Sequence, residues 1–252
     1  MTITIDTKKI FLGLFGVLVI LYGVNIYNTN KLYTGLVDEP VELDFVVIDI
    51  SENKCQECAD PDQVIKVIDS SHNIDYKIKT LDSTEEIAQN YIRQYNIQNL
   101  PAVIVMGDIE NKKITGAWKA LPTKQKSDAV VIENLLPYYN IASETVNGVV
   151  DITLLTDESC DNCFDEKLYL NIFKQFGIKV GQITSYDLSS DKGRELVSKY
   201  SIDKLPTVLV SPEVKVYKRL VDTWSQVGTR ESDGWLVLRE VQKLTADYKT
   251  LN

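Results

Sequence analysis

The chain has 252 residues, of which 44% are hydrophobic and 25% are charged, a composition that is ordinary for a globular protein. A chain of this length has room for two domains of roughly 100–150 residues each. The net charge of −9 argues against nucleic acid as a partner, because phosphate binding needs clustered Lys and Arg side chains.

The cysteine count of four, arranged in two pairs, is too low for a disulfide-dense scaffold. It fits two separate two-cysteine sites or one four-cysteine site. Composition alone leaves both arrangements open.

The N-terminus carries a long apolar run. Residues 1–9 form a short tail that ends in Lys8-Lys9, and residues 10–27 contain no charged side chain. The length of this run is close to the ~20 residues that a helix needs to cross a bilayer. A cleaved signal peptide has a shorter apolar core and a small-residue cleavage site, and no good site follows here. We therefore predict an uncleaved transmembrane helix at residues 10–27.

Charges on the two sides of this run predict its orientation. Two lysines precede it, whereas four acidic residues and one lysine follow it within residues 28–44. The positive-inside rule predicts a cytoplasmic N-terminus and places everything after residue 30 outside the cytoplasm. Residues 28–42 are interpreted as a tether, since Glu39-Pro40 breaks regular structure.

Residues 43–142 are predicted to form a first α/β domain. Leu43–Ile50 is rich in β-branched and aromatic residues, which is typical of a buried strand. Asp60-Pro61-Asp62 fits the first turn of a helix, because proline is tolerated there and acids suit the positive end of the helix dipole. The further elements expected in this domain are strands at residues 74–81, 101–106 and 112–118 and helices at 83–95 and 127–139. The predicted order is β-α-β-α-β-β-α.

Residues 148–252 are predicted to repeat this order in a second domain. The expected elements are strands at residues 149–155, 180–188, 206–210 and 214–224 and helices at 164–176, 189–200 and 232–248. Residues 141–147 join the two domains, and the shortness of this segment predicts that they are packed together or closely tethered.

The repeat rests on a motif that occurs twice. Cys55-Gln56-Glu57-Cys58 and Cys160-Asp161-Asn162-Cys163 contain all the cysteines of the chain. Each is followed at the same distance by Leu-Pro and an apolar run (101 − 55 = 46 and 206 − 160 = 46). The offset of 105 also maps Asp82 onto Asp187, Tyr95 onto Tyr200 and Ser127-Asp128 onto Ser232-Asp233. The chain is therefore an internal duplication in which each copy carries a dithiol and a proline.

The predicted arrangement of strand, Cys-x-x-Cys and helix suggests redox chemistry. Two thiols at this spacing can close a disulfide when the first sits at a helix N-terminus and the second lies in the first turn. The helix dipole and free N–H groups would favour the thiolate of the first cysteine. Cys55 and Cys160 are thus the predicted nucleophiles, and Cys58 and Cys163 would resolve the mixed disulfide.

These motifs resemble the thioredoxin fold over residues 43–140 and 148–250. In that family a cis-proline lies against the dithiol, and Pro101 and Pro206 stand at the matching positions. The residue before it pairs with the backbone of the substrate, a role that the resemblance gives to Leu100 and Leu205.

Two fused units of this kind look like the protein disulfide oxidoreductases of thermophiles and, more loosely, like protein disulfide isomerase. Those proteins are soluble, so the predicted membrane span departs from them.

The resemblance also predicts that the two copies differ. Thioredoxins place a buried acid six residues before the first cysteine, where it accepts a proton during exchange. Asp49 stands there in the first copy, whereas Leu154 stands there in the second. The first copy is therefore predicted to release its mixed disulfide faster. The alternative for Asp49 is a residue that points outward on an edge strand.

The residues between the cysteines depart from the family as well. A carboxylate beside a thiolate disfavours the anion, so Glu57 and Asp161 are expected to raise the thiol pKa values and make the disulfides harder to reduce. Lys54 would partly offset Glu57. We expect the two sites to act as weak oxidants at best, as reductants or as isomerases, or simply to form stable disulfides.

We predict a membrane-anchored thiol–disulfide oxidoreductase that acts on protein thiols or disulfides outside the cytoplasm, together with a redox partner protein and without a cofactor. One alternative is a non-catalytic binding or assembly module with stable disulfides, although closing so short a loop stabilises little. The less favoured alternative is one Cys₄ zinc site, since each pair tops its own predicted domain and has its own proline.

Overall fold

The computed structural model describes Ile26 and residues 39–51, 54–161, 163, 165, 168–245 and 247–251. Apart from Ile26, the predicted transmembrane helix at residues 10–27 lies outside these residues, as do the predicted tail at 1–9 and most of the predicted tether. Among the helices that are described, none combines the length and apolar character needed to cross a membrane.

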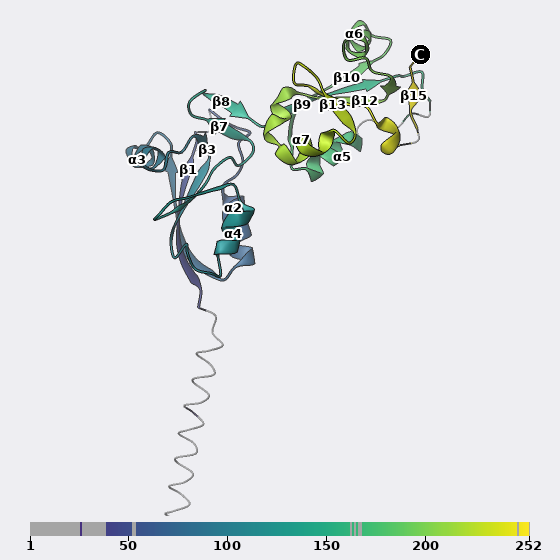
Figure 1. Ribbon diagram of the computed structural model, residues 1–252. Helices are drawn as coiled ribbons and strands as arrows, with labels where there is room; N and C mark the ends of the chain where they lie inside the picture. Colours follow the sequence, from purple (N-terminus) through teal and green to yellow (C-terminus); the bar gives the residue numbers. More distant parts are fainter. Residues whose placement is uncertain are drawn as a thin grey trace, which may run out of the picture.

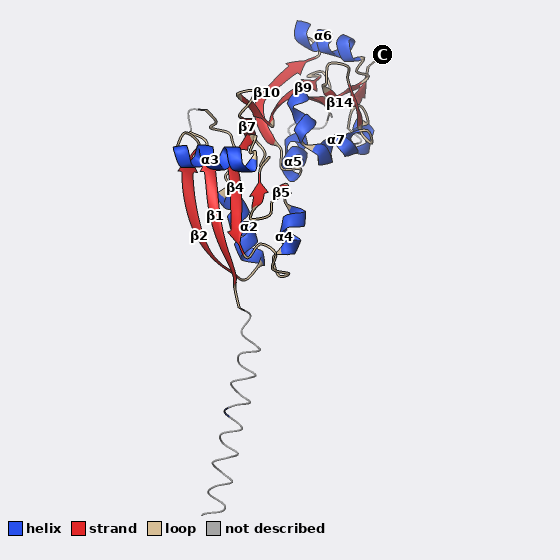
Figure 2. Ribbon diagram, turned by 60° about the vertical axis from the view of Figure 1, so that its left-hand side comes forward, coloured by secondary structure: helices blue, strands red, loops and turns tan. Residues whose placement is uncertain are grey.

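The first unit is built on a five-stranded mixed sheet in the order β2-β1-β4-β6-β5 (Figures 1 and 2). Its strands are β1 (Val41–Asp49), β2 (Ile74–Asp82), β4 (Ala102–Gly107), β5 (Thr123–Gln125) and β6 (Val130–Ile132). Its helices are α2 (Asp62–Ser71), α3 (Glu86–Tyr95) and α4 (Thr115–Ala120). β1 is parallel to β2 and antiparallel to β4.

Alternating side chains of β1 supply apolar groups to both faces of this sheet. Phe45 and Val47 pack in a cluster with residues of α2 and α4. Val46 and Ile48 pack on the opposite face in a cluster with residues of α3. A strand that is buried on both faces explains why Leu43–Ile50 is a nearly continuous apolar run.

The second unit has a sheet of the same topology, in the order β10-β9-β12-β14-β13. Its strands are β9 (Val149–Thr156), β10 (Lys179–Asp187), β12 (Thr207–Val210), β13 (Gly228–Arg230) and β14 (Leu236–Leu238). Its helices are α5 (Leu168–Gln175), α6 (Asp191–Tyr200) and α7 (Lys218–Trp224), with the 3₁₀ turns η1 (Pro212–Val216) and η2 (Val241–Lys243). The sequence repeat is thus also a repeat of strand order.

Two small sheets accompany the large ones. In the first unit, β3 (Asn99–Leu100), β7 (Tyr138–Asn140) and β8 (Thr145–Asn147) pair in the order β3-β7-β8. In the second unit, β11 (Lys204–Leu205) pairs with β15 (Lys249–Thr250). The predicted connection at residues 141–147 is therefore partly a strand, and it folds back on the first unit.

Both predicted closing helices are wrong. Residues 127–139 form β6 and β7, and residues 232–248 contain β14 and η2. Val130, Val131 and Ile132 are buried, and they pair with β4 in the middle of the sheet. Consecutive buried β-branched residues favour a strand with two covered faces, and this outweighs the helical spacing of the wider segment.

The predicted strands at residues 112–118 and 214–224 are also wrong, because they contain α4, η1 and α7. In each case a short helix places a tryptophan in the core. The indole N–H of Trp118 donates to the carbonyl of Ile109 at 2.9 Å, and that of Trp224 donates to the carbonyl of Thr229 at 3.2 Å. Both tryptophans are packing residues.

Candidate functional site

Each Cys-x-x-Cys motif closes its own disulfide. Cys55 bonds to Cys58 with their Cα atoms 5.5 Å apart, and Cys160 bonds to Cys163 with their Cα atoms 5.4 Å apart. In this state none of the four sulfurs is a free thiolate that could bind zinc. The part of the chain that the structure describes also holds no group of three or more His, Cys, Asp or Glu side chains placed to bind a metal.

The first disulfide lies in the loop between β1 and α2, before the helix. α2 begins at Asp62, so Cys55 does not sit at its N-terminus and Cys58 does not lie in its first turn. Pro61 occupies the N-cap position, and the carboxylate of Asp60 accepts the N–H of Asp62 at 3.0 Å. The Asp-Pro-Asp run therefore starts the helix, as predicted, but it leaves both cysteines outside.

The second disulfide has the same relation to its helix. α5 begins at Leu168, and the N–H of Cys163 closes a turn onto the carbonyl of Cys160 at 3.2 Å. Because the effect of a helix dipole falls off within the first turn, it gives no strong preference for a thiolate at Cys55 or Cys160. The predicted reason for their nucleophilic role is therefore wrong, although the role itself stays a prediction.

The prolines stand against the disulfides in both units. The Leu100-Pro101 and Leu205-Pro206 bonds are cis, as the resemblance implies. The Sγ of Cys58 lies 3.8 Å from the carbonyl oxygen of Leu100, and the Sγ of Cys163 lies 3.8 Å from that of Leu205. A disulfide sulfur carries no proton, so these are contacts rather than hydrogen bonds. In both copies it is the second cysteine that meets the residue before the proline.

Burial ranks the two sulfurs of the first pair. Cys55 is only 9% exposed and belongs to the buried cluster on the α3 face of the sheet. Cys58 is partly exposed and packs against the same cluster. A reagent in solvent therefore reaches Cys58 more easily than Cys55, the reverse of the predicted order of attack. In the second pair both cysteines are partly exposed.

The loop of the first disulfide is tied to neighbouring segments. The N–H of Ala59 donates to the carbonyl of Pro137 at 2.8 Å, and the ammonium of Lys54 lies 5.9 Å from the ring centre of Tyr139. Glu57 forms a 2.5 Å ion pair with Lys179 of the second unit. Lys179 rather than Lys54 is thus the cation that directly meets Glu57. The pair is exposed, so its energy is small.

Asp49 ends β1 on the face away from the disulfide. β1 lies between β2 and β4, so the edge-strand alternative is wrong. Ile48 and Ile50 belong to the same cluster as Cys55, and alternation turns the side chain of Asp49 to the other face. Leu154, its counterpart, packs on the corresponding α5 face of the second unit. A proton-accepting role for Asp49 stays a prediction, and this geometry does not favour it.

The backbone before each proline is already paired within the chain. Asn99 and Leu100 form β3 and pair antiparallel with Asn140 and Tyr139 of β7. The resemblance to thioredoxins implied that Leu100 and Leu205 would receive the backbone of a substrate. In this structure a later segment of the same chain holds that position beside Leu100.

In the second unit the same place is taken by β15. Lys204 and Leu205 pair antiparallel with Thr250 and Lys249. The sequence does not predict these covering strands, because their residues carry no chemical motif. The available signal is that both repeats end in a similar short segment, with Tyr138 beginning one and Tyr248 preceding the other.

Lys249 also reaches the loop that precedes Cys160. Its ammonium lies 2.5 Å from a carboxylate oxygen of Asp157 and 3.0 Å from the hydroxyl of Ser159. The hydrogen bond from Lys249, with further bonds from Ser159, holds the pKa of Asp157 below its usual range. The side chain of Asp157 is 7% exposed in this pair. The second site therefore carries a buried carboxylate whose partner comes from the covering strand.

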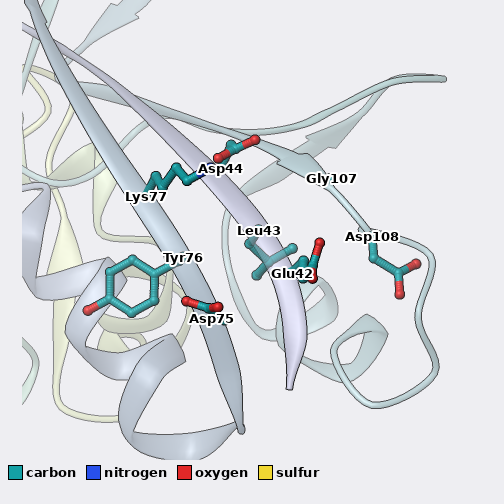
Figure 3. Close-up of a pocket in the computed structure, with 8 residues that line it drawn as sticks. All are labelled: Glu42, Leu43, Asp44, Asp75, Tyr76, Lys77, Gly107 and Asp108. Atoms are coloured by element: carbon teal, nitrogen blue, oxygen red, sulfur yellow. The ribbon is translucent and has the colours of Figure 1, made fainter. Parts of the chain in front are cut away.

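A polar cavity of about 290 Å³ lies at the other end of the first sheet, away from the disulfide. Figure 3 shows its lining, which includes Glu42, Asp44, Asp75 and Asp108. It adjoins the beginning of β1, whereas Cys55 follows the end of that strand.

Comparisons with known proteins add little. No protein-family model matches the sequence, and a search of curated proteins gave no match. Among solved structures, similarity was found to crystal structures of ERdj5 form I and full-length ERdj5, with 13% and 12% sequence identity and a TM-score of 0.19 in both cases. These alignments cover 76% of this chain but only 27% and 30% of those chains. So low a TM-score carries no argument about this protein.

Proposed function

We propose that this protein exchanges thiols and disulfides with protein substrates through two thioredoxin-like units at residues 43–142 and 148–252. The observation that carries the proposal is the repeated contact between a Cys-x-x-Cys disulfide and the carbonyl before a cis-proline. The same strand order surrounds this contact in both units. The apolar run at residues 10–27 supports a membrane anchor that holds both units outside the cytoplasm.

The exchange needs only the two sulfurs of a site and two thiols of a substrate. A substrate thiolate attacks one sulfur, forms a mixed disulfide and releases the other cysteine as a thiolate. A second substrate thiol, once deprotonated, then attacks the mixed disulfide. The substrate leaves as a disulfide, and the site keeps two electrons and, once protonated, two thiols. The reverse sequence reduces a substrate disulfide.

The two sulfurs of the first site differ in how easily a thiolate in solvent can reach them. In the first unit Cys58 is the more exposed sulfur, so attack from solvent would join the substrate to Cys58 and release Cys55. In the second unit the partial exposure of Cys160 and Cys163 permits either product. Pro101 and Pro206 shape the two sites through the carbonyls of Leu100 and Leu205.

A second candidate function is a binding or assembly module with stable disulfides. It is favoured by the pairing of Leu100 with Tyr139, which fills the position where a substrate backbone would lie. For the first unit, the burial of Cys55 and the start of α2 at Asp62, after both cysteines, also favour a binding module.

A redox titration separates the two functions. The full-length chain, in mild detergent, is equilibrated in thiol/disulfide buffers and its free thiols are counted by alkylation. Two double variants isolate the sites: Cys55→Ser/Cys58→Ser and Cys160→Ser/Cys163→Ser. Exchange chemistry predicts a reversible two-electron transition for each pair within roughly −270 to −120 mV. Disulfides that resist reduction until the fold is lost would instead support the binding module.

A further inference from the structure

The strand that covers the second disulfide site lies along the residues directly before Pro206. Lys249 pairs with Leu205 and Thr250 pairs with Lys204. The N–H of Leu251 then donates to the carbonyl of Asp203 at 2.8 Å. Residues 249–251, named the strap here, are thus an extended antiparallel peptide bound to residues 203–205.

Two side chains of the strap enter distinct surroundings. The ammonium of Lys249 meets the largely buried carboxylate of Asp157 and the hydroxyl of Ser159. Leu251 packs against a buried cluster that includes Leu205. The surface under the strap therefore recognises a cation and, two residues later, an aliphatic side chain, while the backbone supplies pairing that any extended peptide can make.

The covering strand of the first unit is fixed more firmly. β7 pairs with β3 on one side and with β8 on the other. The side-chain amide of Asn140 donates to that of Asn99 at 2.7 Å, and the N–H of Ile141 donates to the carbonyl of Gln98 at 2.9 Å. Among the described residues, β15 has β11 as its one partner strand. The strap is consequently the covering segment that is easier to displace.

We propose that the strap is an internal ligand of a peptide-binding groove in the second unit. The groove takes an extended segment of a partner protein that carries a Lys or Arg followed two residues later by an aliphatic residue. Such a segment replaces the strap beside Leu205 and so lies next to the disulfide of Cys160 and Cys163. This inference deepens the proposed function by naming the substrate class of one site, but peptide binding itself requires no electron transfer.

The test uses a fluorescein-labelled peptide with the sequence of residues 247–251, Asp-Tyr-Lys-Thr-Leu, and measures its anisotropy with the full-length chain. Lys249→Glu places a second carboxylate beside Asp157 and so releases the strap while leaving the groove intact. We expect this variant to bind the peptide at least 10-fold more tightly than the wild type. Leu251→Asp, which removes the aliphatic contact of the strap, is expected to act in the same direction.

Three controls fix the interpretation. Lys243→Glu changes the same charge in an exposed ion pair with Glu240, away from the groove, and should bind the peptide like the wild type. Asp157→Asn loosens the strap but also removes the partner of the peptide's lysine, so it should show no gain. A peptide with Glu in place of Lys should not bind to Lys249→Glu.

Equal affinity of Lys249→Glu, Leu251→Asp and the wild type would overturn the proposal, as would equal binding of the charge-reversed peptide. The redox titration is read separately. Sites that fail to titrate while the peptide still binds would reject exchange chemistry and keep the groove. Sites that titrate without any peptide binding would do the opposite.

Discussion

A tyrosine–aspartate hydrogen bond recurs in the two units. The hydroxyl of Tyr95, at the end of α3, donates to Asp128 at 3.0 Å. The hydroxyl of Tyr200, at the end of α6, donates to Asp233 at 3.0 Å. Both bonds join a helix to the turn before a central strand. They explain why these residues keep the constant offset that the sequence shows.

The first of these bonds predicts an alkaline loss of stability. Burial, and then the hydrogen bond to Asp128, raises the pKa of Tyr95 to about 12. Because folding favours the protonated phenol, its contribution is fully present below the ordinary value of about 10 and is lost as the pH rises towards 12. Tyr95→Phe should cost about 1 kcal/mol at neutral pH and flatten this decline.

Urea unfolding at a series of pH values measures both effects. Tyr91→Phe is the control, since Tyr91 stacks on Tyr95 with ring centres 6.1 Å apart but is not the donor to Asp128. It should keep the alkaline decline. An unchanged pH profile in Tyr95→Phe would assign the decline to other groups.

Single residues also show which parts of the two sites the sequence predicts and which it does not. The cysteines, the prolines and their spacing follow from chemistry that the sequence displays, and the cis bonds agree with it. The contacts of Leu100 with Tyr139 and of Asp157 with Lys249 do not follow from the sequence, because they join distant segments through residues that belong to no motif. The sequence around Lys249 contains no pattern that would place this lysine beside a disulfide.

At the scale of elements, the first strands and helices of each unit were predicted well, whereas the strands at residues 112–118 and 214–224 and the closing helices were not. β1, β2, α2 and α3 follow from periodicity and from strong start signals. The segment at residues 127–139 has apolar residues at helical spacing, but its Val130–Ile132 core is stabilised by pairing with β4. The spacing of apolar residues shows which faces of one segment are apolar. It does not show whether that segment pairs with another strand, because pairing depends on the whole sheet.

The residue after β6 fixes the segment that leads to the first proline. Glu133 is 2% exposed, forms an ion pair with Lys124 and accepts the N–H of Gln98 at 3.1 Å. Strand pairing shows which residue takes this place in the second unit: Val131 pairs with Ile104, and Val237 pairs with Leu209, so the residue after β14 that corresponds to Glu133 is Arg239. Arg239 forms an ion pair with Glu231 at 2.9 Å, so the second unit has a different ion pair at this place.

The ion pair between Glu133 and Lys124 predicts that substitutions of these two residues have non-additive effects. Glu133→Ala should destabilise the chain by about 1–3 kcal/mol, because it leaves the Gln98 N–H unbonded and Lys124 without its partner. The double variant Lys124→Thr/Glu133→Leu removes both charges and should recover part of that loss, since apolar replacement of a whole buried ion pair is often tolerated.

Denaturant unfolding of Glu133→Ala, of the double variant and of its two single variants, Lys124→Thr and Glu133→Leu, gives the coupling. Lys124 is 38% exposed, so its single substitution should cost less than that of Glu133. A double variant that is less stable than Glu133→Ala would show that the acid is needed for the Gln98 hydrogen bond rather than for charge pairing.

For the whole molecule, the sequence predicted two copies joined by a short connection but not how they meet. The connection contributes β8 to the first unit, and β7 and β8 lie on the side of that unit nearest the second (Figure 1). Leu136 packs against the core cluster of the second unit. The hydroxyl of Tyr217 donates to the carbonyl of Gly148 at 2.6 Å and accepts the N–H of Lys179 at 3.0 Å. These two bonds fix the first residue of the second unit, while the packing of Leu136 and the ion pair between Glu57 and Lys179 cross the junction, so the two units are more than tethered.

Gly148 is the residue on which this junction depends most directly. Its φ of +93° is unfavourable for any residue with a side chain, and an added Cβ would lie 3.0 Å from Leu136 and 3.3 Å from the backbone of Pro137. Gly148→Ala should therefore destabilise the chain by more than about 1 kcal/mol and weaken the contact between the units. Gly116 in α4 is the matched control, because an added Cβ there meets nothing within 4 Å. Gly116→Ala should stabilise that helix by up to about 1 kcal/mol.

Tryptophan fluorescence during urea unfolding measures both units, since Trp118 reports on the first and Trp224 and Trp235 report on the second. A Trp118→Phe variant isolates the second signal, and a Trp224→Phe/Trp235→Phe variant isolates the first. In an otherwise unchanged chain we expect the two transitions to coincide, because a packed junction couples the units. In Gly148→Ala they should separate, whereas in Gly116→Ala they should stay together. Coincident transitions at an unchanged midpoint in Gly148→Ala would mean that the junction contributes nothing to stability and that the two units fold independently of it.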